Sequence, residues 1–193
     1  MRRSDRGSSD RSGRVRAIAL TGTPGTGKSR VALLLRDRWD VEEAADLALR
    51  AGAGRRLARG TEVDIAPLSR RMRSRSLPLP ELVVGHLAHL LPVSGAVVLR
   101  CRPDVLRARL ARAGRGTRSE RQSNFVAEAV DLVLREALDR GLVVWELDTT
   151  DRRPQEIARE VDRLLRERPP AKRIPVDWLA DPRVTAHLLD PTS

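Results

Sequence analysis

One eight-residue stretch constrains the fold of this chain more than any other: residues 22–29, with the sequence GTPGTGKS. The stretch matches the pattern G-x-x-x-x-G-K-[ST] in full, and it lies between an apolar run at 15–20 and a segment whose apolar residues have helical spacing. Glycines let the backbone curl so that successive N–H groups point inward at a polyphosphate, and the following helix adds its unpaired N–H groups. The sequence therefore predicts a P-loop that binds a nucleoside triphosphate.

Two side chains of this loop are suited to phosphoryl chemistry. Lys28 would reach the β- and γ-phosphates of ATP, and the hydroxyl of Ser29 would be a ligand of Mg²⁺. We therefore predict ATP and Mg²⁺ as cofactors, with Ser29 as the metal-ligating residue. The predicted nucleotide-binding residues are Gly22, Gly25, Thr26, Gly27, Lys28, Ser29 and Arg30.

Short apolar runs alternate with helical patterns along the rest of the chain. Strands are predicted at residues 15–21, 40–43, 82–84, 96–99 and 142–147. Helices are predicted at 28–39, 44–59 with a break at 52–54, 64–72, 104–112, 120–140 and around 157–165. Apolar runs this short suit a parallel sheet covered on both faces, and the alternation implies right-handed crossovers. We predict an α/β P-loop NTPase fold with a doubly wound, five-stranded parallel sheet.

Positive charge is concentrated in three segments of this 193-residue chain, whose net charge is +11. Residues 1–16 hold six arginines and two acids, and residues 50–75 and 100–121 each hold eight arginines and two acids. The remainder is net acidic, so the basic segments indicate phosphate-bearing ligands. Lys28 and Lys172 are the only lysines, and biased codon use is the simplest reason for that preference for arginine.

The composition also bounds the domain organisation and the compartment. We expect a disordered basic tail at 1–13, one P-loop domain at 14–168 and a C-terminal tail at 169–193. The chain has no run of about 18 apolar residues, so we expect no membrane span and no secretory signal. The single cysteine, Cys101, excludes an internal disulfide, which favours a reducing, cytoplasmic setting.

Two basic insertions narrow the class of P-loop protein. The chain has no second long domain and no Asn-Lys-x-Asp motif for reading guanine, which argues against motor proteins and GTPases. A small kinase-like core remains, with insertions at 44–75 and 112–121. Arginines on such arms neutralise the charge of the acceptor and of the transferring group, and they close over the site.

Four segments of the chain resemble one known family. They are LTGTPGTGKS at 20–29, GHLAHLLP at 85–92, VVLRCRPDVLRARL at 97–110 and SNFVAEAVDLVLREA at 123–137. Together they resemble the atypical adenylate kinase family that also acts in small-ribosomal-subunit maturation, especially its archaeal members. The resemblance covers about residues 15–166, and the later VDW at 176–178 resembles a tail element of the archaeal members.

This resemblance implies a fold of the nucleoside-monophosphate kinase type and a broad-specificity kinase (ATP + AMP to 2 ADP) with ATPase activity. It also implies a small-subunit ribosomal protein as partner and a role in small-subunit rRNA maturation and ribosome assembly. The basic arms are candidates for contact with rRNA. Residues 44–75 align with the monophosphate-binding arm and 112–121 with the lid.

The resemblance extends to single residues. His86 occupies the position of the family's histidine, where it would position water or the γ-phosphate or serve as a structural loop residue. Either Arg112 or Arg115 could be the lid arginine, because the lid is out of register with the family's triplet. The predicted catalytic residues are thus Lys28, His86, Arg112 and Arg115.

One expected residue is absent. The family has an acid that anchors Mg²⁺ after the third strand, and the chain has Val84 or Gly85 at that place. We therefore expect a weakly fixed metal that depends on a remote acid, either Asp46 or Asp148. The absence leaves open an ATP-switched assembly factor with little or no kinase activity. A small-molecule kinase with a non-nucleotide acceptor, such as shikimate, is a third reading.

Overall fold

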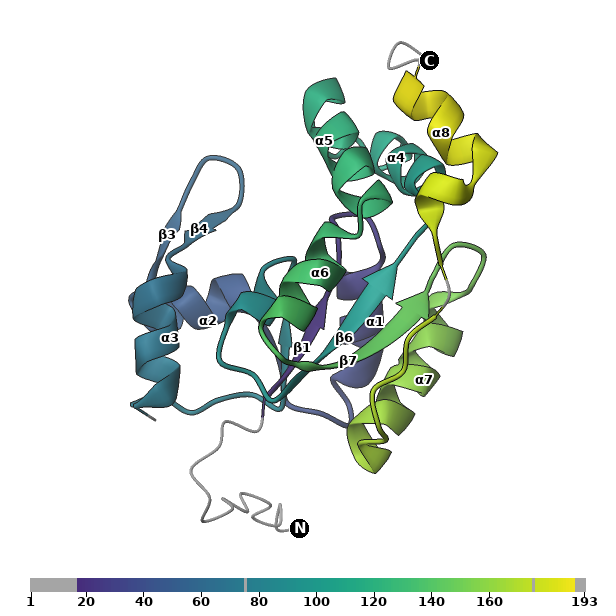
Figure 1. The fold of residues 1–193 in the computed structure, drawn as a ribbon. Helices are drawn as coiled ribbons and strands as arrows, with labels where there is room; N and C mark the ends of the chain where they lie inside the picture. Colours follow the sequence, from purple (N-terminus) through teal and green to yellow (C-terminus); the bar gives the residue numbers. More distant parts are fainter. Residues whose placement is uncertain (1–16, 75, 175, 190–193) are drawn as a thin grey trace.

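The computed structural model describes residues 17–74, 76–174 and 176–189, and the predicted tail at 1–13 lies outside these ranges (Figure 1). Five strands form one parallel sheet in the order β2–β5–β1–β6–β7. They are β1 (Ile18–Thr21), β2 (Val41–Glu43), β5 (Leu82–Val84), β6 (Gly95–Arg100) and β7 (Val143–Asp148). The predicted α/β fold with a five-stranded parallel sheet is confirmed.

Helices connect the strands of this sheet. They are α1 (Lys28–Leu35), α2 (Ala44–Arg50), α3 (Ile65–Arg73), α4 (Pro103–Arg112), α5 (Arg118–Ala129), α6 (Leu132–Asp139), α7 (Pro154–Glu167) and α8 (Pro182–Leu189), with short 3-10 turns η1 (Ala88–Leu90) and η2 (Trp178–Ala180). None of the helices in the described ranges is long and apolar enough to span a lipid bilayer.

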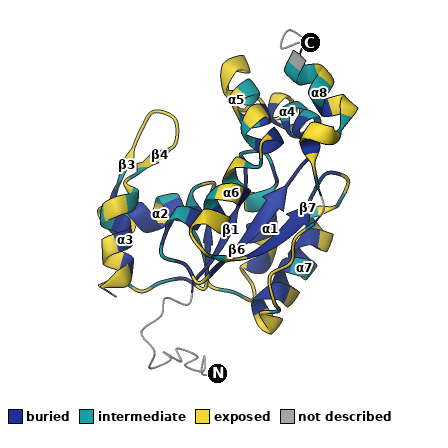
Figure 2. Ribbon diagram, in the orientation of Figure 1, coloured by how far each residue is buried: buried dark blue, intermediate teal, exposed yellow. Residues whose placement is uncertain are grey.

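The central strands β1, β5 and β6 are buried on both faces, as the dark blue centre of Figure 2 shows. Because successive strand residues point to opposite faces, Ile18 and Leu20 pack with α1 and α7, whereas Ala17 and Ala19 face the side of α2 and α6. Helices therefore cover both faces, and the carboxyl ends of all five strands lie along one edge, where ligands bind in folds of this kind.

The first insertion contains a β-hairpin where a helix was predicted. Helix α2 ends at Arg50, and β3 (Gly54–Arg56) pairs antiparallel with β4 (Thr61–Val63), so the predicted helix over 44–59 is wrong in its second half. The turn is closed by a hydrogen bond from Leu57 N to Gly60 O, with Gly60 at φ 85°. Alanine, leucine and arginine favour helix locally, and the pairing with β4 overrides that preference.

The predicted helix over 120–140 is divided into two. A capping box between Thr117 and Glu120 starts α5 at Arg118. Asp131 then adopts a left-handed conformation with φ 59°, which ends the first helix, and its carboxylate pairs with the buried Arg100. The periodic apolar pattern continues through this break, so only the tertiary contact reveals it.

The segment after residue 169 packs on the domain. Lys172 continues the sheet with backbone hydrogen bonds to Val144 O and from Glu146 N. Trp178 and Val184 then pack on Phe125 of α5. The last described part of the predicted tail therefore packs on α4 and α5 (Figure 1).

A cluster of charges is buried at the end of β6. Arg100 is 2% exposed and donates to Glu128 Oε1 at 2.8 Å and to Glu146 Oε1 at 2.9 Å, in addition to its pair with Asp131.

We predict that Arg100→Met destabilises the protein by about 3–5 kcal/mol, because it leaves buried carboxylates without their partner. Urea unfolding measures the loss. Arg55→Met, which breaks an exposed pair with Glu62, is the control and should cost far less; equal losses would contradict the prediction.

Candidate active site

The P-loop joins β1 to α1 at the carboxyl edge of the sheet. Gly22 has φ 136°, and a Cβ added there would lie 2.3 Å from the carbonyl oxygen of Leu99 on β6. Gly27 is the N-cap of α1 and has φ 99°. Both positions require glycine, because an L side chain is strained at these φ values and the first would also collide with the neighbouring strand.

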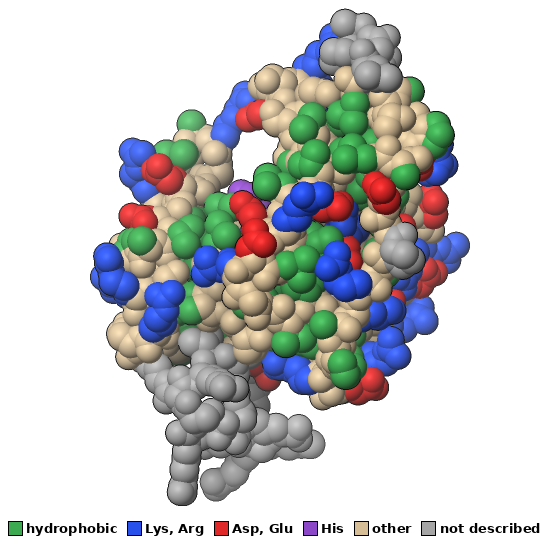
Figure 3. All heavy atoms as spheres, in the orientation of Figure 1, with side chains coloured by type: hydrophobic (Ala, Val, Ile, Leu, Met, Phe, Trp, Pro, Cys, Tyr) green, Lys and Arg blue, Asp and Glu red, His purple; other side chains and the backbone are tan. Residues whose placement is uncertain are grey.

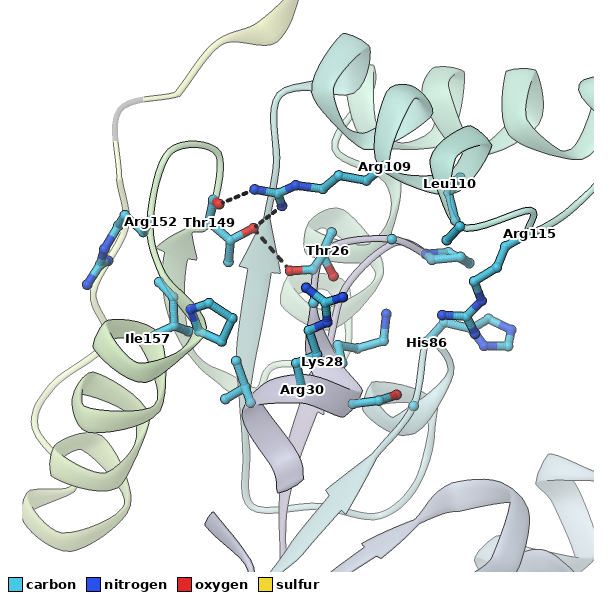
Figure 4. Close-up of a pocket in the computed structure, with 18 of the residues that line it drawn as sticks. Thr26, Lys28, Arg30, His86, Arg109, Leu110, Arg115, Thr149, Arg152 and Ile157 are labelled. Carbon is cyan, nitrogen blue, oxygen red and sulfur yellow. Dashed lines mark hydrogen bonds between the residues drawn. The ribbon is translucent and has the colours of Figure 1, made fainter. Parts of the chain in front are cut away.

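A pocket of about 740 Å³ opens over this loop. The P-loop forms its floor, α4 and the turn after it form one side, and the segment from β7 into α7 forms the other (Figure 4). Most of the predicted site residues line it; they are Gly25, Thr26, Gly27, Lys28, Ser29, Arg30, His86, Arg112 and Arg115. Gly22 is buried beneath the loop, where it sets the backbone path.

Lys28 is folded back onto the loop. Its Nζ donates to Gly22 O at 2.6 Å and to Thr23 O at 3.0 Å. Burial lowers the pKa of Lys28 from 10.5 to about 8, and nearby Glu128 and Glu43 oppose that shift. The ammonium group of Lys28 is therefore poorly solvated. It lies beside the P-loop backbone N–H groups that would bind the phosphates.

The three other predicted catalytic residues come from two segments, the loop after β5 and the end of α4 with the turn that follows it. His86 follows β5, and its pKa is lowered by partial burial and then by Lys28 and His89, so its imidazole is neutral at pH 7. Arg112 and Arg115 lie at the end of α4 and in the turn after it, and both reach the pocket. Arg115 is among the charges that lower the pKa of Lys28, so it is close to the phosphate-binding loop. In Figure 4, Arg115 and His86 lie toward the same end of the pocket.

His89 supports the loop that carries His86. It is fully buried; its Nδ1 lies 3.0 Å from Thr21 Oγ1 and its Nε2 lies 2.9 Å from Glu136 Oε2. Thr21 also donates to the carbonyl of His86 at 3.2 Å. These contacts tie the loop after β5 to the end of β1, so His89 has a structural place outside the pocket.

Sequence reasoning missed a carboxylate that shapes the P-loop. Thr23 Oγ1 donates to Glu128 Oε2 at 2.5 Å, and Glu128 Oε1 accepts from Arg100 and from the backbone N–H of Cys101 at 3.1 Å. Helix α5 is therefore hydrogen-bonded to the nucleotide loop. Nothing in the local sequence around residue 128 signals this contact, which spans 105 residues.

Arg109 was also missed. Its guanidinium donates to Thr149 O at 2.8 Å and to Thr150 O at 2.6 Å, which joins α4 to the loop after β7 (Figure 4). Thr149 Oγ1 in turn lies 3.0 Å from Thr26 O. Arg109 and Ile157 border one end of the pocket. Arg109 supplies a planar cation there, and Ile157 supplies an apolar side chain.

The two acids proposed to replace the missing one do not line this pocket. Asp148 accepts from the N–H and hydroxyl of Thr150 at 2.8 and 2.5 Å, so it stabilises a turn. Asp46 is exposed and outside the pocket lining. Glu43, at the end of β2, is the acidic residue that lines this pocket within the described ranges, and the sequence analysis did not single it out.

Comparisons with known proteins found several similar chains. The family model described as AAA domain matches residues 18–131. A protein of Archaeoglobus fulgidus named "Putative adenylate kinase" is 40% identical over 171 residues, 85% of this chain and 92% of that protein. One of the same name from Pyrococcus abyssi is 37% identical over 167 residues, 83% of this chain and 90% of that protein. Among solved structures, shikimate kinase from Bacteroides thetaiotaomicron has 16% identity and a TM-score of 0.41, over 78% of this chain and 98% of that one.

We predict that Lys28→Ala lowers nucleotide turnover by about 10²-fold or more and leaves the fold intact, because it removes charge stabilisation from the transferring phosphate and no core packing. A coupled ADP-release assay and thermal unfolding measure the two effects. Lys172→Ala, which removes the other lysine, is the matched control. Turnover at the wild-type rate in the Lys28 variant would rule out the P-loop as the reacting site.

The depressed pKa of Lys28 gives a second prediction. A bound phosphate beside Lys28 raises its pKa again, so metal-free ADP should bind with uptake of protons near pH 8, and its affinity should fall as the pH rises above about 8. Calorimetry in two buffers of different protonation enthalpy measures the uptake. The uptake should disappear in Lys28→Ala, and its absence from the wild type would contradict the low pKa.

Proposed function

We propose that this chain, which belongs to the "Putative adenylate kinase" family, is a broad-specificity nucleoside monophosphate kinase. It would transfer the γ-phosphoryl group of ATP to AMP or a related monophosphate, and hydrolyse ATP slowly when no acceptor is bound. The observation that carries this proposal is the pocket over the P-loop, which is lined by Lys28, His86 and Arg115.

The donor nucleotide would lie along the pocket, from the P-loop toward Arg109 and Ile157. Its phosphates would lie on the N–H groups of the P-loop, with Lys28 turned from the loop carbonyls to the phosphates. The base would lie at the opposite end, where it could stack on the guanidinium of Arg109 and contact Ile157. The hydroxyl of Ser29 is a hard oxygen donor in the pocket, which suits Mg²⁺, and Mg²⁺ when bound would neutralise charge on the phosphates.

The acceptor would enter from the side of the first insertion. The arm, which we define as α2, the β3–β4 hairpin and α3, faces α4 and α5, which we call the lid helices, across an opening that Figure 3 shows in space-filling form. The hairpin carries Arg55, Arg56 and Arg59, and Arg59 is among the charges that lower the pKa of Glu120 on α5. These cations and those of the turn after α4 would neutralise the monophosphate and draw arm and lid together.

We extend the proposal to a role in small-subunit rRNA maturation and ribosome assembly, with a small-subunit ribosomal protein as partner. The support is the resemblance of the four sequence segments and the net charge of +11, much of it on the arm and the lid helices. Exposed arginines on such surfaces attract nucleic acid through phosphate contacts.

A second candidate is an ATP-switched assembly factor with little or no kinase activity, and the absence of an acid at Val84 or Gly85 favours it. An acceptor panel of AMP, CMP, GMP and dAMP, with shikimate included, separates the candidates. The kinase requires ADP formation that depends on a nucleoside monophosphate. ATP-dependent co-purification with a ribosomal protein and no acceptor-dependent turnover would establish the assembly factor instead.

The lid arginines can be separated by mutation. Arg115 is the one electrostatically coupled to Lys28, so we predict that Arg115→Ala lowers kcat by at least about tenfold with little change in ATP affinity, because the contact strengthens in the transition state. Arg112→Ala should have the smaller effect. Steady-state kinetics and binding of metal-free nucleotide measure the two quantities, and equal small effects would assign both arginines to the solvated surface.

A further inference from the structure

The end of β2 lies beside the position of the absent acid. Strands β2 and β5 are parallel neighbours, and Glu43 is directly in register with Val84. In-register residues of parallel strands point to the same face, about 4.8 Å apart. Val84 is fully buried with Leu20 and Val31 on the α1 side, so Glu43 projects to that same side, where α1 begins with the P-loop lysine and serine.

Glu43 lines the same pocket as the residue expected to ligate the metal. Glu43, Ser29 and Lys28 all border this pocket, so their side chains would lie beside the phosphates of a nucleotide bound on the P-loop. A carboxylate only accepts hydrogen bonds, so a Ser29 hydroxyl that donates to Glu43 would keep its oxygen lone pairs for a metal ion. The negative charge of Glu43 would also attract a cation into the pocket.

The carboxylates on neighbouring elements already have partners. Glu128 is bound by Thr23, Arg100 and the backbone of Cys101, and Glu136 by His89. Neither of these two carboxylates lines the pocket, whereas Glu43 does. An acid restored at Gly85 would be crowded, because a Cβ there would lie 3.1 Å from the Cβ of Ala44.

We propose that Glu43 is the positioning residue for the magnesium of the nucleotide. It orients the Ser29 hydroxyl toward the cation and supplies the negative charge that an acid at the end of β5 would supply. The inference rests on the proposed function, since it requires a nucleotide phosphate at the P-loop. It replaces the expectation of a weakly fixed metal, because the carboxylate has moved to the adjacent strand.

The test measures metal binding rather than turnover. Mn²⁺ is titrated into the complex with the non-hydrolysable analogue AMPPNP and followed by electron paramagnetic resonance. Glu43→Gln keeps the shape and removes the charge, and it should weaken Mn²⁺ by about 10–100-fold, the range for residues that orient a metal ligand. Glu42→Gln is the matched control: Glu42 is the preceding residue, in register with Val83, and pairs with Arg50 at 2.6 Å. It should leave Mn²⁺ affinity unchanged.

A second measurement separates this inference from the proposed function. AMPPNP affinity in EDTA should be unchanged or slightly higher in Glu43→Gln, since a negative charge near the phosphates is gone. Because Glu43 acts through Ser29, the loss in the Ser29→Ala, Glu43→Gln double variant should be smaller than the product of the single losses.

Normal AMPPNP binding with unchanged Mn²⁺ affinity in Glu43→Gln would overturn the role of Glu43 and leave the kinase proposal standing. Equal Mn²⁺ losses in Glu43→Gln and Glu42→Gln would overturn it too, by showing a general charge effect. No AMPPNP binding by the wild type would overturn both proposals. Glu43→Ala serves the same titration if Glu43→Gln does not fold.

Discussion

The buried guanidinium of Arg100 is the interaction on which the arrangement of the site depends. A charge in the protein interior is costly unless it is paired and hydrogen-bonded. Arg100 meets this requirement with Glu128 from α5, Glu146 from β7 and Asp131 from the α5–α6 junction. Each partner comes from a different element, so the need to satisfy one cation holds two helices and two strands in a single relative position.

The same cluster joins the P-loop to α5 and to the segment after α7. Glu128 accepts from Thr23 of the P-loop with its second oxygen, and Glu146 accepts from Arg173 and from the backbone of Ile174. Trp178 lies 6.0 Å from the Arg100 guanidinium. A movement of α5 would therefore displace the P-loop at the floor of the pocket. If α5 moved alone, Glu128 could not keep its hydrogen bonds to both Thr23 and Arg100.

Parallel strand geometry places Glu43 beside the end of β5. All five strands end at one edge, so side chains on neighbouring strands reach the same volume from slightly different directions. Glu43 on β2 and Val84 on β5 are in register, and the carboxylate needs only to cross one strand spacing to face the P-loop hydroxyl. The chemistry of the edge depends on which groups reach it, and less on which strand carries them.

The sequence by itself determined the sheet, its parallel class and the P-loop, and most of the site residues predicted from it line the pocket. These features depend on local patterns: glycines at fixed spacing, short apolar runs and helical periodicity. The hairpin at 54–63 and the break at Asp131 escaped because local propensity favoured helix there, and pairing with β4 and with Arg100 decided otherwise. Glu43, Glu128 and Arg109 were decided by tertiary structure alone, since each acts through contacts with distant segments. Thr23 meets Glu128 across 105 residues, and Thr149 meets Thr26 across 123. Only the folded sheet brings such side chains within hydrogen-bond distance, because no periodicity in the chain encodes which of its buried polar groups will meet.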